Sequence, residues 1–161
     1  MVADNNSNKN YIIRSNNGYT LLELIVVISI ISALLLMSFK GLLIIKQNYD
    51  LNVAAHQLEA TLKDCQGRAM YTGGYYKIDF YPSLNRYRVY HESVLIEDVQ
   101  LEDINLHYTN FTNNKVYFYK TGTPSMGGTV TLKTKNGRTL YVIMTPVTAR
   151  IRVSTKPPDN W

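Results

Sequence analysis

Cysteine and histidine are scarce in this chain. Among its 161 residues it has one cysteine, Cys65, which excludes a disulfide within the chain. Its three histidines, His56, His91 and His107, are dispersed and have no metal-ligand spacing such as HExxH. The sequence also lacks a GxSxG nucleophile motif and a glycine loop ending in GKS or GKT. We therefore predict that the protein is not an enzyme and needs no metal or cofactor.

Acidic residues are the minority among the charges. The chain has 12 acids against 17 lysines and arginines, and its formal net charge is +5. Between Glu92 and Asp103 there are five acids and no base. From Asn110 to Trp161 the one acid is Asp159, and the bases are Lys115, Lys120, Lys133, Lys135, Arg138, Arg150, Arg152 and Lys156. We expect the globular part to have an acidic region and a separate basic region.

Charge is almost absent from one long stretch near the N-terminus. The run Leu24 to Phe39 reads LIVVISIISALLLMSF, and between Tyr19 and Phe39 the one charged residue is Glu23. As a helix this stretch would be roughly 31 Å long, about the thickness of a bilayer's hydrocarbon core. It is predicted to span a membrane. A carboxylate inside such a run is costly and indicates a functional partner, which a cut after Gly18 would supply as the new amine of Tyr19.

GYTLLELIVVISIISALLL resembles the N-terminal signature of type IV pilins and of the pseudopilins of type II secretion and competence systems. The resemblance implies that residues 1–18 are a leader, removed by a prepilin peptidase that cuts after Gly18 and methylates Tyr19. It also implies that Glu23 neutralises an N-terminal amine, usually that of a neighbouring subunit, when subunits join a filament. The leader departs from the family pattern, because Ser-Asn-Asn separates Arg14 from Gly18 where many leaders place lysines.

Plainer interpretations of the apolar run remain open. A secretory signal peptide would have a shorter, uncharged core and a small-residue cleavage site, whereas Met37-Ser38-Phe39-Lys40 follows here. A simple membrane anchor would tolerate Glu23 without using it, and a buried core helix would seldom be so long. Two basic residues precede the run and two follow it, so the positive-inside rule does not orient the helix. The resemblance implies a single-pass protein of a bacterial cytoplasmic membrane with an extracytoplasmic C-terminal domain.

Beyond the run the pattern changes to an amphipathic helix and then to strands. Apolar residues at three- and four-residue spacing form one stripe: Leu51, Ala54, Ala55, Leu58, Leu62, Cys65 and Ala69. The helix should end near Tyr71, before Thr72-Gly73-Gly74. Alternation then predicts strands at residues 75–81, 86–91, 104–108, 115–120, 129–134, 138–145 and 149–153, with an acidic link at 93–99. Asn136-Gly137 favours a type I′ turn.

These patterns predict an α+β fold in which a long N-terminal helix packs on antiparallel sheet. We divide the chain into a leader (1–18), a membrane and filament-core helix (19–45), an amphipathic helix half (46–72) and a β domain (73–161). The later segments resemble minor pseudopilins, namely the H subunit of type II secretion, FimT-like minor pilins and competence pseudopilins. Phe118, Gly122, Gly127-Gly128 and the strand from Arg150 to Val153 match, whereas Ala149 stands where those families have glycine.

Three functions follow as hypotheses. The first is a minor pilin or pseudopilin whose partners are the prepilin peptidase, other pilin subunits and the membrane. The second is a DNA-binding subunit of a competence pilus, in which Tyr87 or Tyr90 would stack on bases and arginines and lysines would contact phosphates. Its candidate residues are Arg86, Arg88, Arg150, Arg152, Lys133 and Lys135. The third is a membrane-anchored sensor or adhesin with no assembly role.

Overall fold

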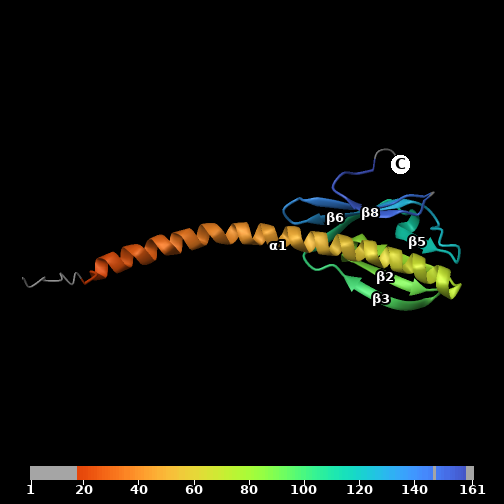
Figure 1. Ribbon diagram of the computed structural model, residues 1–161, viewed down its shortest axis with the longest axis horizontal. Helices are drawn as coiled ribbons and strands as arrows, with labels where there is room; N and C mark the ends of the chain where they lie inside the picture. Colours follow the sequence, from red (N-terminus) through yellow and green to blue (C-terminus); the bar gives the residue numbers. More distant parts are fainter. Residues whose placement is uncertain (1–17, 147, 159–161) are drawn as a thin grey trace, which may run out of the picture. The chain divides into compact units, whose positions relative to one another are not determined.

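The computed structural model describes residues 18–146 and 148–158, without the side chains of residues 37 and 38. The chain divides into two units, one up to Phe39 and one from Lys40 onward, which we describe separately. Helix α1 (Leu21–Thr72) contributes residues to both (Figure 1).

In the first unit, α1 is a helix with apolar side chains on every face. Thr20 caps its start, because the Glu23 N–H donates to Thr20 Oγ1 at 3.2 Å and the Leu24 N–H to the Thr20 carbonyl at 3.1 Å. The hydroxyls of Ser29 and Ser32 donate to carbonyls four residues earlier, each at 2.7 Å. Such bonds satisfy polar groups without water. The helix contains a stretch long and apolar enough to cross a membrane, and none of that stretch is buried.

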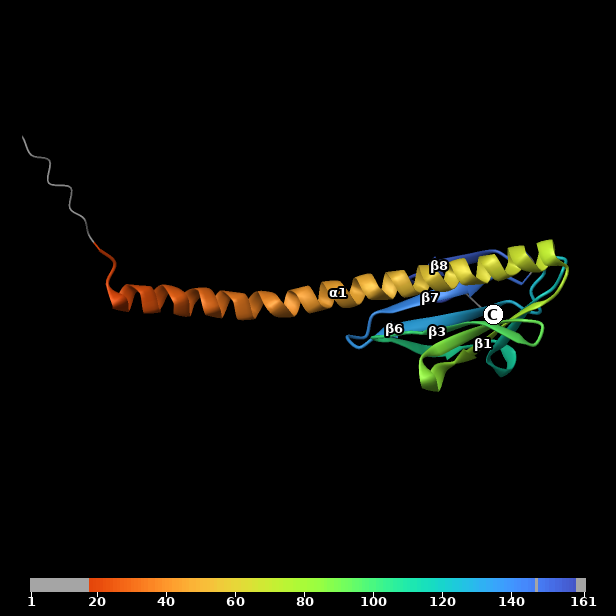
Figure 2. The same ribbon diagram turned by 90° about the horizontal axis from the view of Figure 1, so that it is seen from below.

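In the second unit, the described residues form two four-stranded antiparallel sheets. The first sheet has the order β3-β2-β1-β5, with bounds β1 Tyr76–Tyr81, β2 Arg86–His91, β3 Val94–Gln100 and β5 Lys115–Phe118. The second has the order β4-β6-β7-β8, with bounds β4 Ile104–Thr109, β6 Gly128–Thr134, β7 Thr139–Met144 and β8 Ile151–Ser154. Two short 3-10 turns, η1 (Pro82–Leu84) and η2 (Thr112–Asn114), join strands. The second half of α1 runs along both sheets (Figures 1 and 2).

One core joins the helix to the two sheets. The stripe on α1 is buried as its spacing predicts, with Leu51, Leu58 and Leu62 almost fully inaccessible. Ile78 and Phe118 from the first sheet belong to the same cluster. The second sheet also contributes residues to this cluster, among them Val130, Leu132, Leu140 and Val142. The α+β architecture with a long N-terminal helix on antiparallel sheet is therefore confirmed.

Two local predictions were wrong. The segment at 93–99 is not a link but strand β3, which pairs with β2 from Arg86↔Gln100 to His91↔Val94. The turn at Asn136-Gly137 is not type I′, since that turn needs positive φ at both central residues and only Gly137 (φ 94°) has it. The Gly137 N–H donates to the Thr134 carbonyl at 3.1 Å, and the turn is a three-residue loop with glycine in the left-handed position.

Candidate functional site

The first turn of α1 carries the candidate assembly site. Gly18 and Tyr19 lie outside the helix, and the Tyr19 side chain is 87 % exposed. Glu23 is exposed and, within residues 18–146 and 148–158, has no ion-pair partner. It borders a hollow of about 340 Å³ that is otherwise lined by Tyr19, Leu24 and Val27. A carboxylate therefore stands unneutralised on an apolar helix, one turn from Tyr19.

The chemistry of this turn is electrostatic. A carboxylate in the first turn of a helix is stabilised by the helix dipole, but the dipole alone does not offset transfer into lipid. A full positive charge at contact distance offsets much more of that cost. Hydrolysis of the Gly18–Tyr19 bond would create such a charge on Tyr19. Gly18 is exposed, and a Cβ added there would meet no described residue beyond its chain neighbour within 4 Å, so no described side chain covers this bond.

The basic residues proposed for DNA binding lie on both sheets. On the outer face of β2, Arg86 Nη1 and Arg88 Nε approach the same oxygen, Asp98 Oδ2, at 3.3 and 2.9 Å. Lys135 Nζ lies 2.9 Å from Asp103 Oδ1. Each of these three residues therefore has a carboxylate partner in the same chain, and Arg86 and Arg88 share the single negative charge of Asp98.

Lys133, Arg150 and Arg152 belong to the second sheet or its connections. None of them has an ion-pair partner in the part of the chain that the structure describes. The expectation that Tyr87 stacks on bases was wrong, because Tyr87 is fully buried and its hydroxyl lies 3.3 Å from Thr61 Oγ1. Tyr90 is half-buried beside Lys77, whose Nζ lies 4.0 Å from the ring centre.

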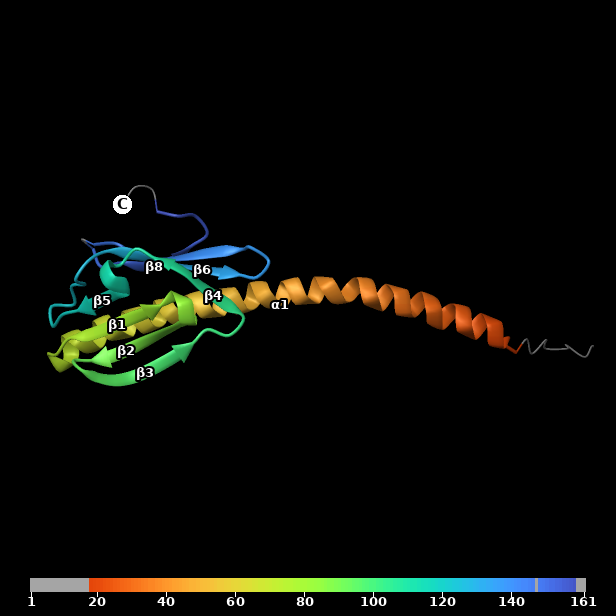
Figure 3. The same cartoon turned by 180° about the vertical axis from the view of Figure 1, so that it is seen from behind.

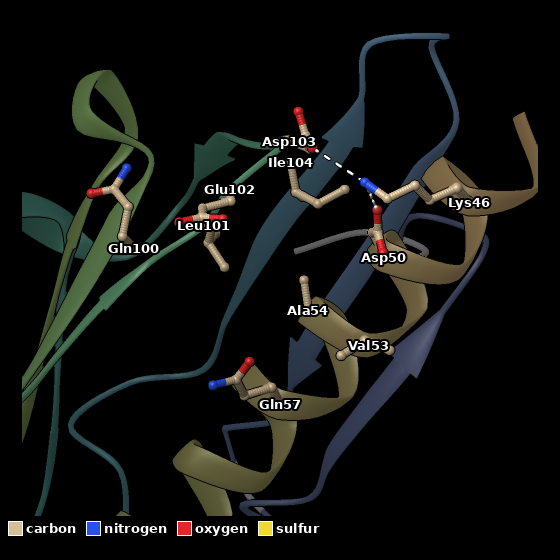
Figure 4. A pocket seen from close by; sticks show the side chains of 10 residues that line it. All are labelled: Lys46, Asp50, Val53, Ala54, Gln57, Gln100, Leu101, Glu102, Asp103 and Ile104. Carbon is tan, nitrogen blue, oxygen red and sulfur yellow. Dashed lines mark ion pairs between the residues drawn. The ribbon is translucent and has the colours of Figure 1, made fainter. Parts of the chain in front are cut away.

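A groove of about 260 Å³ between α1 and the β3–β4 connection was not predicted (Figure 4). Lys46 Nζ stands between Asp50 Oδ2 at 3.4 Å and Asp103 Oδ2 at 3.6 Å. Lys135 and Lys46 hold the pKa of Asp103 below its usual value, and Asp50 raises the pKa of Lys46. The Lys46–Asp50 ion pair can be predicted from the i,i+4 spacing of the two residues on a helix. The contact between Lys46 and Asp103 depends on the tertiary fold. Among the described residues no three His, Cys, Asp or Glu side chains gather as metal ligands would.

Comparisons with known proteins agree with these features. The family model of the prokaryotic N-terminal methylation motif matches residues 13–39. No curated protein matches the chain significantly in sequence.

Solved structures show the same fold at low sequence identity. The minor pseudopilin EpsH from the type 2 secretion system of Vibrio cholerae is 10% identical, with a TM-score of 0.56 over 65% of this chain and 96% of that one. The type IV minor pilin FimU of Pseudomonas aeruginosa matches in two crystal forms, at 13% and 12% identity and TM-scores of 0.54 and 0.55. These matches cover 65% and 66% of this chain and 92% and 90% of FimU.

The motif and the shared fold cover different lengths of the chain. The motif covers the start of α1, and the shared fold covers about two thirds of the chain. The methylation motif at residues 13–39 and the fold shared with a minor pseudopilin and a minor pilin support the resemblance of this chain to type IV pilins and pseudopilins.

Proposed function

We propose that this chain is a minor pilin or pseudopilin that is stored in the membrane and enters an extracytoplasmic filament after its leader, residues 1–18, is removed. Cleavage lies between Gly18 and Tyr19, and Tyr19 becomes the methylated N-terminus. Glu23 then pairs with the Tyr19 amine of a neighbouring subunit. The observation that carries the proposal is the exposed carboxylate of Glu23, unpartnered among the described residues, on a helix that is otherwise apolar.

The apolar surface of α1 supplies most of the affinity in this proposal. Leu22, Ile25 and Leu36 are more than half exposed, and residues of this kind continue along the whole run. Such a surface is stable in lipid or against the helices of other subunits, but not in water. Burial is non-directional, so it does not by itself fix how far one helix slides along another. The pair between Glu23 and an amine acts at one position and sets that register.

Charge removal at Glu23 tests the assembly role. We expect Glu23→Gln and Glu23→Val to be cleaved and inserted in the membrane like the wild type, and to be absent from sheared filaments when assayed by immunoblot. The matched control is Ser29→Ala, which removes a hydroxyl that bonds only within its own helix and should leave incorporation unchanged. Normal incorporation of both Glu23 variants would rule out the role.

Mass spectrometry of the membrane-extracted chain tests the processing step. Co-expression with a prepilin peptidase should give a product that begins at Tyr19 and carries one added methyl group. Gly18→Val should block the cut without disturbing the fold, because no described residue beyond its chain neighbour lies within 4 Å of a Cβ added at Gly18. An intact chain in the presence of the peptidase would favour a membrane-anchored sensor or adhesin instead.

The assignment as a minor subunit rests on the likeness of fold to EpsH and FimU, which are themselves minor subunits. Quantitative mass spectrometry of purified filaments provides the test. We expect this chain at a small fraction of the amount of the most abundant pilin. Equal or greater abundance would make it a major subunit.

DNA binding is a second candidate, favoured by Arg150 and Arg152, exposed and without an ion pair among the described residues. A gel-shift titration of the full chain in detergent at 50 mM salt measures it. Arg152→Ala should weaken DNA binding and reduce its salt dependence, whereas Arg88→Ala should have a smaller effect, because Arg88 is ion-paired with Asp98. Absence of binding, or binding independent of salt, would remove this candidate.

A further inference from the structure

The edges of the two sheets are not protected alike. β5, at one edge of the first sheet, is closed by the loop that follows it. The Ser125 N–H donates to the Tyr117 carbonyl at 2.8 Å, and Ser125 Oγ accepts from the Tyr117 N–H at 3.1 Å. A further bridge joins Phe118 to Pro124. This edge has no room for another strand.

β4, at one edge of the second sheet, is closed by the turn at Asn85. Asn85 Oδ1 accepts from the Leu106 N–H at 3.2 Å, and Asn85 Nδ2 donates to Asn105 Oδ1 at 3.3 Å. The Asn85 carbonyl also accepts from the Leu101 N–H at 2.8 Å, just before the strand. A side chain and a turn of the same chain therefore occupy this edge.

The other two edges, β3 and β8, are open over the described part of the chain. β3 pairs only with β2 and β8 only with β7, and no other backbone hydrogen bond to a described residue reaches either strand. Figure 3 shows β3 along the lower border of the first sheet, with no strand beyond it. Each open edge leaves unpaired N–H and C=O groups that a strand from another molecule can satisfy.

The open edge of β3 is apolar and acidic. Val94 is 68 % exposed, and Leu95 and Ile96 are each 47 % exposed. Glu97 follows, exposed and without an ion pair to any described residue. Natural edge strands are usually blocked by lysine or proline, and β3 contains neither.

The open edge of β8 has the opposite charge. Arg152 lies on the strand, Arg150 lies directly before its first residue, and both side chains are exposed. Lys156 follows the strand, and the sequence from Arg138 to Pro158 contains no acid. One molecule thus has one acidic and one basic open edge, on different sheets.

We propose that β3 of one copy pairs edge to edge with β8 of a second copy. Backbone hydrogen bonds join the strands, Val94, Leu95 and Ile96 become covered, and Glu97 faces the arginines of the partner copy. The contact uses different surfaces on the two copies, so it is heterologous and can repeat from copy to copy. Its use in a filament rests on the proposed function, but the contact itself requires only two copies side by side.

A charge-swap experiment on the full chain in detergent tests this contact by sedimentation velocity. The wild type should associate at 50 mM salt and separate at 500 mM, where charge attraction is screened. Glu97→Lys places a positive charge on β3 opposite the basic β8 edge of another copy, and Arg152→Glu leaves β3 acidic and reduces the positive charge of β8. Each variant alone should associate at least tenfold more weakly, and an equimolar mixture of the two should recover association. Lys120→Glu, an exposed charge reversal on neither strand, should behave as the wild type.

The outcomes separate this proposal from the function of Glu23. The Glu23→Gln chain should keep the association, because its β edges are unchanged. The proposal is overturned if the wild type is a monomer at 50 mM salt. A wild type that binds a different pilin subunit but not a second copy of itself also overturns it. It is also overturned if the single variants associate normally or if their mixture does not recover. Circular dichroism of each variant excludes unfolding as the cause of lost association.

Discussion

Two buried ionisable side chains, one on α1 and one on β2, illustrate how the core acts on single residues. Cys65 is 2 % exposed and Tyr87 is fully buried. Burial raises the pKa of the Cys65 thiol and of the Tyr87 phenol to about 12 each. Both groups are therefore held neutral at physiological pH, and Cys65 is a packing residue, as its place in the helical stripe predicts.

These pKa shifts predict a loss of stability in alkali. The ordinary pKa values are 9.0 for the thiol and 10.0 for the phenol, so above those values the unfolded chain releases protons that the folded chain keeps. The free energy of unfolding should fall as pH rises from about 9 to about 12, by up to ~1.4 kcal/mol per pH unit for each group. Near-UV circular dichroism during urea unfolding at several pH values measures this slope.

Cys65→Ala with Tyr87→Phe should flatten that slope. Tyr71→Phe is the matched control, because Tyr71 is 94 % exposed and its removal should leave the slope unchanged. Equal slopes in the wild type and the double variant would contradict the explanation.

At the scale of elements, two glycines that look alike in the sequence have different roles. Gly67 lies inside α1, and a Cβ there would meet no other atom within 4 Å. Gly122 has a positive φ of 76°, its carbonyl accepts from Gln66 Nε2 at 2.9 Å, and an added Cβ would lie 2.5 Å from Met70 Sδ. Gly122 therefore holds its loop against the end of α1, whereas Gly67 only loosens the helix.

Alanine at these positions should change stability in opposite directions. Gly67→Ala should raise the free energy of unfolding by about 0.5–1 kcal/mol, because alanine loses less backbone entropy in a helix. Gly122→Ala should lower it by about 1–2 kcal/mol, since an L residue is strained at this φ and Met70 must move. Thermal unfolding of the two variants beside the wild type provides the comparison. A change of the same sign in both would refute the different roles.

Strand β3 shows why local patterns failed in one element. Alternation reveals a strand when one of its faces is buried and the other is not, but six of the seven residues of β3 are exposed. A bulge also shifts its register between Val89 and Tyr90 of β2, so Ile96 has no partner of its own. β3 forms because its backbone makes hydrogen bonds with the edge of β2. Backbone hydrogen bonds do not produce a periodic pattern of side chains, so the sequence does not reveal this strand.

At the scale of the whole molecule, orientation in the membrane stays a prediction. We expect the second unit to face outward from the cytoplasmic membrane. Lys120→Cys places a thiol on an exposed position of that unit. In intact spheroplasts a membrane-impermeant maleimide should label this variant without lysis. The wild type should stay unlabelled, because Cys65 is buried and its raised pKa keeps it a thiol. Labelling of Lys120→Cys only after lysis would reverse the orientation.

The sequence by itself determined the features that depend on neighbours along the chain. The apolar run, the position of Glu23, the stripe from Leu51 to Ala69 and the end of α1 beside Gly73 follow from composition and helical spacing. The predicted pilin fold followed from the same stretch, since its signature is local. The cleavage site at Gly18 and the pairing of Glu23 stay predictions that experiment must decide.

Only the tertiary structure decided which charges are free and which edges are open. Arg88 and Arg152 are both predicted to be outward arginines on strands, yet Arg88 is ion-paired with Asp98, whereas Arg152 has no ion pair among the described residues. The difference arises because β3 lies beside β2 and brings its acid there. An ion pair or an open edge depends on which strands are neighbours, and strand order is fixed by contacts between residues far apart in the chain.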